Sequence, residues 1–286
     1  MLTGLSLAAL ASVAFGLASI LQAIGARAEP GRDRLDVFLL VRLLRQPAFL
    51  ASMGLSLVGF FLHLLALRQL PLFVVQPVIA GSVAVTAVVS GRMAREPLGP
   101  RVRLLVVLLC AGLALVTAAA VSGSAVSTSP SQRALLLLVV LALAAAGWPA
   151  ARVRGPGGAA LLGLLSGVGY AVVAVAGRAM PSLALADLVA DPAAYALVSG
   201  GGLAILLYSV SLQRGTVVAA TAAMVLGNTV TPMAIGLLAL GDRIRPGWTL
   251  AAIAGLALAA TAVILLHGPR ADASEPARLP SPAPGA

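Results

Sequence analysis

Side chains that can bind a small solute are scattered at helical spacing through long apolar runs of the sequence. Amides, hydroxyls and phenols three or four residues apart share one face of a helix and can line a solute pathway. Gln76 and Asn228 stand out because a buried amide without a partner costs about 1–3 kcal/mol. His63 is the only mid-run group that titrates near neutrality, so a proton relay is an open alternative there. The candidate cavity-lining residues are Gln22, His63, Gln76, Pro77, Tyr170, Tyr208, Thr221, Asn228 and Thr231.

A second interpretation of the same residues is structural. Serine, threonine and other small polar residues join transmembrane helices by hydrogen bonds worth about 0.6 kcal/mol each. We favour this interpretation for any single Ser or Thr, and for His63 as a satisfied polar residue near the interface. For Gln76 and Asn228 both interpretations stay open.

Three charged residues at the ends of apolar runs are candidate gate or loop charges. Glu96 and Asp242 each follow a long apolar run and lie beside arginines, so they are either solvated helix ends or gate pairs on opposite faces. Exposed ion pairs of this kind are weak. Arg178 ends its run just before Met180-Pro181, where its side chain either extends to the interface or faces the cavity and favours an anionic group.

Several kinds of chemistry are excluded by what the sequence lacks. It has no nucleophile with a base partner and no phosphate-binding glycine loop, so we expect neither an enzyme nor a cofactor. One cysteine, Cys110, and two histidines cannot supply a disulfide framework or a Cys/His metal site. No Asp or Glu falls in the middle of an apolar run, which disfavours a magnesium site and carboxylate coupling. A neutral or amphipathic solute fits better.

The elements that must position these residues are membrane-spanning helices. Of the 286 residues, 60% are hydrophobic and 10% are charged, and the mean hydropathy is +1.05. A soluble domain needs more polar surface than this, so the sequence predicts an all-α integral membrane protein. The chain has 30 glycines and only 4% aromatic residues, so its helices can approach closely.

About 20 helical residues cross the hydrocarbon core of a bilayer, and runs of about that length predict nine spans. The nine runs are residues 2–24, 48–67, 72–91, 102–122, 134–150, 159–179, 194–212, 216–240 and 247–266. Residues 268–286 are rich in Pro, Ala and Arg and predict a disordered tail. The first run could instead be a cleaved signal peptide, because Ala26-Arg27-Ala28 resembles a cleavage site, but no basic residue precedes it.

The arginines predict an orientation in the cell membrane. The net charge of +10 comes from 19 basic residues, all arginines, that lie between apolar runs or in the tail, so topology explains them better than nucleic acid does. Short loops rich in arginine stay in the cytoplasm. Most of the arginines fall after the odd-numbered spans or in the tail. This places the N-terminus outside and the C-terminus in the cytoplasm. The opposite face carries Arg68, Arg133, Arg178, Arg243 and Arg245.

The two halves of the sequence share an order of landmarks. LALRQLPLFVVQP (65–77) corresponds to SVSLQRGTVVAAT (209–221), MAREPLGPR (93–101) to LALGDRIRPGW (238–248), and GARA (25–28) to AGRA (176–179). Four-span units separated by one span insert in opposite orientations, which is the pattern of inverted-repeat transporters. We therefore divide the chain into a first repeat (1–133), a linker span and loop (134–158), a second repeat (159–267) and the tail (268–286).

These features resemble the drug/metabolite transporter superfamily, including its EamA-type members. The segment LLRQPAFLASMGLSLVGFFLHLLALRQLPLFVVQP and the MAREPL exit are most similar to the branch with the NIPA-type magnesium transporters. The resemblance covers residues 2–266 and implies a membrane carrier of small solutes or ions. NIPA-type proteins tend to carry an acidic residue and an Asn in the second span, where this chain has Val58-Gly59-Phe60. That departure argues against magnesium as the substrate.

The sequence thus predicts a carrier that moves a small solute or metabolite across the cytoplasmic membrane by alternating access. Its cavity would lie between spans one, two, three, six, seven and eight. As partners we expect membrane lipids and a small-molecule substrate but no nucleic acid, and a homodimer stays open. Two alternatives remain: a NIPA-like magnesium or other divalent-cation transporter, and a non-transport scaffold for an envelope or lipid biosynthetic enzyme.

Overall fold

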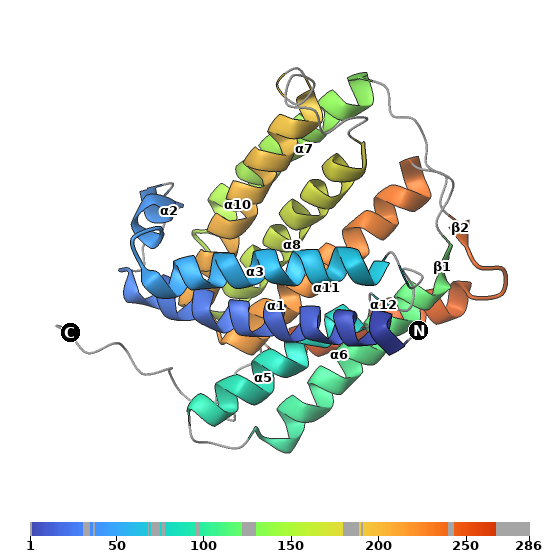
Figure 1. Cartoon of the computed structure of the whole chain (residues 1–286), viewed down its shortest axis with the longest axis horizontal. Helices are drawn as coiled ribbons and strands as arrows, with labels where there is room; N and C mark the ends of the chain where they lie inside the picture. Colours follow the sequence, from blue (N-terminus) through green and yellow to red (C-terminus); the bar gives the residue numbers. More distant parts are fainter. Residues whose placement is uncertain are drawn as a thin grey trace.

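A computed structural model of the chain describes residues 2–30, 35–36, 38–67, 69, 75, 78–94, 98–121, 130–179, 189, 191–239 and 243–266. Nearly all of this is helix, because a helix satisfies its own backbone groups where water is absent. Figure 1 shows the arrangement. The helices are α1 (Leu2–Ala28), α2 (Phe38–Leu43), α3 (Pro47–Leu67), α5 (Ser82–Met93), α6 (Pro100–Ala119), α7 (Pro130–Ala150), α8 (Gly155–Ala179), α10 (Pro192–Arg214), α11 (Val217–Ala239) and α12 (Thr249–Leu266).

Six of the described helices are long and apolar enough to cross a membrane, which indicates a multi-pass membrane protein. They correspond to the first, fourth, fifth, sixth, seventh and ninth predicted spans. The other three predicted spans overlap shorter apolar helical segments, Pro47–His63, Val78–Met93 and Val217–Thr231. Length and composition therefore support spanning for six of the nine predicted runs.

The structure departs from the sequence prediction at the ends of the spans. The prediction of an all-helical fold is confirmed, apart from one small addition: a two-residue strand β1 (Ala120–Val121) pairs antiparallel with β2 (Arg243–Ile244). This pairing satisfies backbone groups at the end of α6 and before α12. A short helix, α2, occupies part of the predicted first loop. Helix α7 begins at Pro130, four residues before the predicted fifth span, and ends at Ala150 as predicted, with Pro149 in its last turn.

The helices pack as two groups with a shared interface. In the first, α1 packs along α3 and α5; in the second, α8 packs along α10 and α11. Helix α6 packs against α12, and α5 against α11 (Figure 1). One apolar core surrounds Phe49, Leu207 and Tyr208, and another surrounds Val83 and Leu109.

The contact between α6 and α12 depends on two glycines that face each other. A Cβ added to Gly112 would lie 2.6 Å from the carbonyl oxygen of Gly255, and one added to Gly255 would lie 2.7 Å from that of Gly112. Both distances are shorter than real Cβ atoms show to other heavy atoms. The backbones can approach this closely only because neither residue has a side chain, as expected for helices packed in lipid.

Candidate functional site

A buried group of uncharged polar side chains lies where α1 meets α10 and α11. Helix α10 ends at Arg214, and Gly215 and Thr216 connect it to α11. This short connection turns the chain back, so that Tyr208, before the end of α10, faces Thr221, after the start of α11. We call this group the polar cluster; its members are Ser19, Gln22, Tyr170, Tyr208, Ser209 and Thr221.

The central contact of the polar cluster joins Tyr208 to Thr221. Their hydroxyl oxygens are 2.6 Å apart, and the Thr221 hydroxyl is also 2.6 Å from the carbonyl oxygen of Val217. Thr221 has one proton, and donating it to Val217 leaves its oxygen to accept from Tyr208. The Tyr208 oxygen then keeps its own capacity to accept a hydrogen bond.

Helix α1 reaches the polar cluster through its amide and a serine. The Gln22 amide nitrogen donates to the Ser209 hydroxyl oxygen at 3.2 Å, and Ser209 donates to the carbonyl oxygen of Ile205 at 2.8 Å. The Ser19 hydroxyl donates to the carbonyl oxygen of Phe15 at 3.0 Å. Ser19 and the phenol of Tyr170, on α8, both lie near the Tyr208 phenol. Four helices therefore contribute to one site.

The chemistry available in the polar cluster is hydrogen bonding without formal charge. Its amide, hydroxyls and phenols both donate and accept, which suits a neutral polar solute. Tyr208 is 2% exposed and Thr221 is 1% exposed, whereas Tyr170 is half-buried. A solute therefore reaches most of these groups only after the surrounding helices move.

Other predicted residues lie away from this group. His63, on α3, is half-buried with its ring centroid 6.5 Å from that of Phe15, and among the described residues its Nε2 has no hydrogen-bond partner. Asn228 is exposed and Thr231 is half-buried. Asn228 comes about two helical turns after Thr221 on α11, roughly 10 Å along the axis. The structure thus brings together Gln22, Tyr170, Tyr208 and Thr221.

Several predicted residues cannot be placed. Gln76, Pro77, Glu96 and Asp242 lie outside the described residues, so the predicted kink and gate charges stay predictions. Arg178 belongs to α8, but its side chain is likewise outside what the structure describes. The predicted tail also falls outside the described part of the chain.

Sequence reasoning missed a second polar contact, where the C-terminal ends of α1 and α10 meet. Arg27, in the last turn of α1, donates to the carbonyl oxygens of Leu212 at 2.9 Å and Gly215 at 2.7 Å. In return, the Gln213 amide donates to the carbonyl oxygens of Ala26 at 2.7 Å and Glu29 at 3.3 Å. We call this reciprocal contact the α1–α10 latch. A polar residue in the last turn of each helix was the signal available in the sequence.

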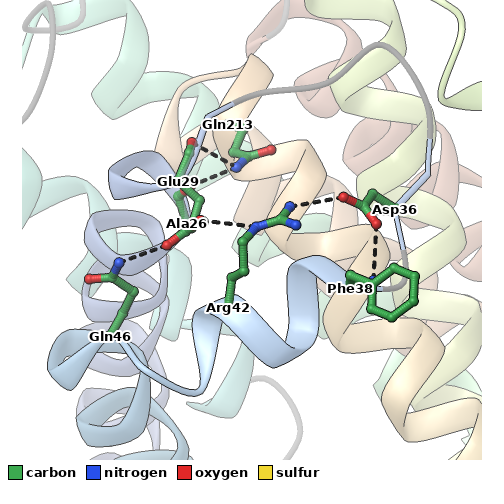
Figure 2. A network of polar contacts seen from close by, with 7 residues as sticks. All are labelled: Ala26, Glu29, Asp36, Phe38, Arg42, Gln46 and Gln213. Carbon is green, nitrogen blue, oxygen red and sulfur yellow. Dashed lines mark hydrogen bonds and ion pairs between the residues drawn. The ribbon is translucent and has the colours of Figure 1, made fainter.

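An ionic network supports the α1 side of the latch (Figure 2). The Glu29 carboxylate accepts from the Arg42 guanidinium at 3.1 Å and from the Gln46 amide at 2.8 Å. The Asp36 carboxylate accepts from Arg42 at 2.9 Å and from the backbone N–H of Phe38 at 3.0 Å. The hydrogen bond to Asp36, followed by its charge and by Glu29, raises the pKa of Arg42 above its ordinary value. Arg42 therefore stays charged and holds α2 against the end of α1.

Among the described residues, no three His, Cys, Asp or Glu side chains gather where they could hold a metal ion. Comparison of the chain with protein-family models, with curated proteins and with solved structures finds no match. Its function is therefore argued from its own residues and geometry.

Proposed function

We propose that this protein is a membrane carrier that moves a small, neutral, polar solute by alternating access, in the manner of the drug/metabolite transporters. The observation that carries the proposal is the polar cluster. Gln22 comes from the first half of the chain, whereas Tyr208, Ser209 and Thr221 come from the second. Binding groups shared between two halves are what a carrier needs, because relative motion of the halves exposes the site alternately to each side.

Corresponding helix pairs support an inverted repeat. The pairing of α1 with α3 has a counterpart in α8 with α10, and that of α1 with α5 has one in α8 with α11. Helices α6 and α12 would then be equivalent to each other, as would α5 and α11, and each of these pairs is in contact. In this arrangement α7 is the linker span. Inverted repeats are the pattern of carriers that work by alternating access, so the repeat supports this mechanism as well as the site.

The arginine distribution supports a place in the cytoplasmic membrane with the N-terminus outside and the C-terminus inside. The NIPA-like alternative would require oxygen ligands of formal charge for a divalent cation. No member of the polar cluster carries a formal charge, so the neutral solute is the better-supported substrate class. The scaffold alternative has no specific observation in its favour.

The test is solute counterflow in proteoliposomes with a panel of neutral polar solutes. We expect Tyr208→Phe to reduce counterflow by about tenfold or more, because it removes a hydroxyl that only the binding site uses. Ser166→Ala is the matched control. Ser166 is equally buried and donates to the carbonyl oxygen of Ala204 at 2.8 Å, but this bond joins α8 to α10 within one half.

Equal counterflow in both variants would remove the polar cluster as the binding site. Counterflow of none of the solutes, with magnesium uptake that is lost in Glu96→Gln, would instead favour the divalent-cation alternative. Monodisperse elution after purification shows that each variant is folded.

A further inference from the structure

The α1–α10 latch and the polar cluster lie on the same two helices, about one turn apart. Along α1, Gln22 precedes Arg27, and along α10, Ser209 comes about one turn before Gln213. The latch therefore covers the polar cluster from the end where α1 and α10 terminate.

Electrostatic interactions between the two helix ends decide whether the latch stays closed. Two helix C-termini converge here, and each carries a partial negative charge of about half an electron. Left alone, these ends repel each other. The Arg27 guanidinium supplies the positive charge that offsets this repulsion, and its planar fork donates at once to the carbonyls of Leu212, in the last turn of α10, and Gly215, directly after it. Loss of Arg27 therefore leaves Gln213 alone to hold the two helix ends together.

The contacts between the halves are asymmetric. Helix α1 of the first half packs on both α10 and α11 of the second. In the proposed repeat, the equivalent pairs are α8 with α3 and α8 with α5, and among the described residues these make at most marginal contact. The packing of α1 on α10 and α11 thus has no close counterpart at α8 in the described part of the chain, whereas α6 with α12 and β1 with β2 also join the two halves.

We propose that Arg27 and Gln213 form a gate that closes one end of the polar cluster and opens during transport. This inference rests on the proposed transport function. It adds the gating residues and the state of this structure, in which the α1–α10 latch is formed.

The test measures access to the polar cluster without any substrate. The sole cysteine is replaced (Cys110→Ala) and Ser209→Cys, a change of nearly equal size, supplies a buried reporter thiol. The protein is placed in vesicles of one orientation, and a membrane-impermeant maleimide is added from the face that carries Arg27. Combining Arg27→Gln with Gln213→Leu should raise the labelling rate about tenfold or more, the effect of losing a charged hydrogen bond.

Matched variants separate gating from general loosening. Arg214→Gln is the control, because the Arg214 guanidinium donates to the carbonyl oxygen of Val153 at 3.2 Å, a contact between the end of α10 and the linker loop before α8 that does not involve α1. We expect it to label at the parent rate. Arg27→Lys keeps the charge without the fork and should label at an intermediate rate, which covers the case where Arg27→Gln does not fold.

Parent-like labelling in both the double variant and Arg27→Lys would overturn the gate, as would an equal rise in Arg214→Gln. The result is distinguishable from failure of the transport proposal. If labelling responds as expected but no solute shows counterflow, the gate proposal is supported and the transport proposal is contradicted. If Tyr208-dependent counterflow is seen with unchanged labelling, the gate proposal is contradicted and the transport proposal is supported.

Discussion

Single buried polar residues in this protein act by joining helices, and Asp191 is the clearest example outside the polar cluster. One carboxylate oxygen accepts from the backbone N–H of Ala193 at 2.9 Å and caps α10. The other forms an ion pair with Arg133 of α7. Asp191 is 7% exposed, and the Arg133 Nε is buried with no hydrogen-bond partner among the described residues. The Asp191 carboxylate therefore balances the charge of the Arg133 guanidinium, which lacks one of its hydrogen bonds.

We predict that Asp191→Ala lowers the free energy of unfolding by about 3 kcal/mol, because it leaves a buried charge unpaired and removes a helix cap. Asp191→Asn keeps an oxygen that can cap α10, so the decrease in its free energy of unfolding should be smaller by about 1 kcal/mol. Unfolding of the purified protein by a denaturing detergent, followed by circular dichroism, measures both values. Equal stability of the Ala variant and the parent would contradict the ion pair.

At the scale of elements, glycine positions decide which helices can touch. The α6–α12 contact has a glycine on each side, whereas a Cβ added to Gly54 on α3 would meet no atom within 4 Å. Both Gly112 and Gly54 lie within helices of similar length. They differ in whether another backbone occupies the space of the missing side chain.

Gly112→Ala should therefore destabilise the protein by about 1–3 kcal/mol, because the added methyl group forces α6 and α12 apart. Gly54→Ala should be neutral or stabilising by about 0.5–1 kcal/mol, because alanine is the better helix former. Heating each detergent-solubilised variant and measuring the folded fraction by size-exclusion chromatography gives the comparison. A lower stability of the Gly54 variant than of the Gly112 variant would rule out the close contact as the cause.

At the scale of the whole molecule, the number of crossings decides the topology. Six described helices meet the requirements for a span, and three shorter apolar segments coincide with the remaining predicted spans. An odd number of crossings places the two termini on opposite sides of the membrane, and an even number places them on the same side. The proposed repeat requires nine.

We accordingly predict that epitope tags at the two ends are accessible from opposite sides of the membrane. Antibody binding to intact and permeabilised cells measures this. A tag inserted at Arg152, in the turn between α7 and α8, is the internal reference and should share the side of the C-terminus. Termini on the same side would show that the shorter segments do not all cross, and would remove the nine-span repeat.

The candidate site was predictable only in part from the sequence. Helical spacing selected Gln22, Tyr208 and Thr221, and the structure buries all three, because an amide and hydroxyls in apolar helices must find partners. It singled out Asn228 more strongly, and the structure leaves that side chain exposed. Periodicity specifies which face of a helix is polar but not which other helix that face meets.

What the sequence by itself determined is the set of long helices, since apolar runs of sufficient length have few alternatives in lipid. Only the tertiary structure decided which helix ends meet. The bonds between Arg27 and the end of α10, and between Gln213 and the end of α1, join residues far apart in the chain. Their acceptors are backbone carbonyls, which every residue has, so the residue types mark the donors but not their partners. Such contacts follow from the packing of whole helices.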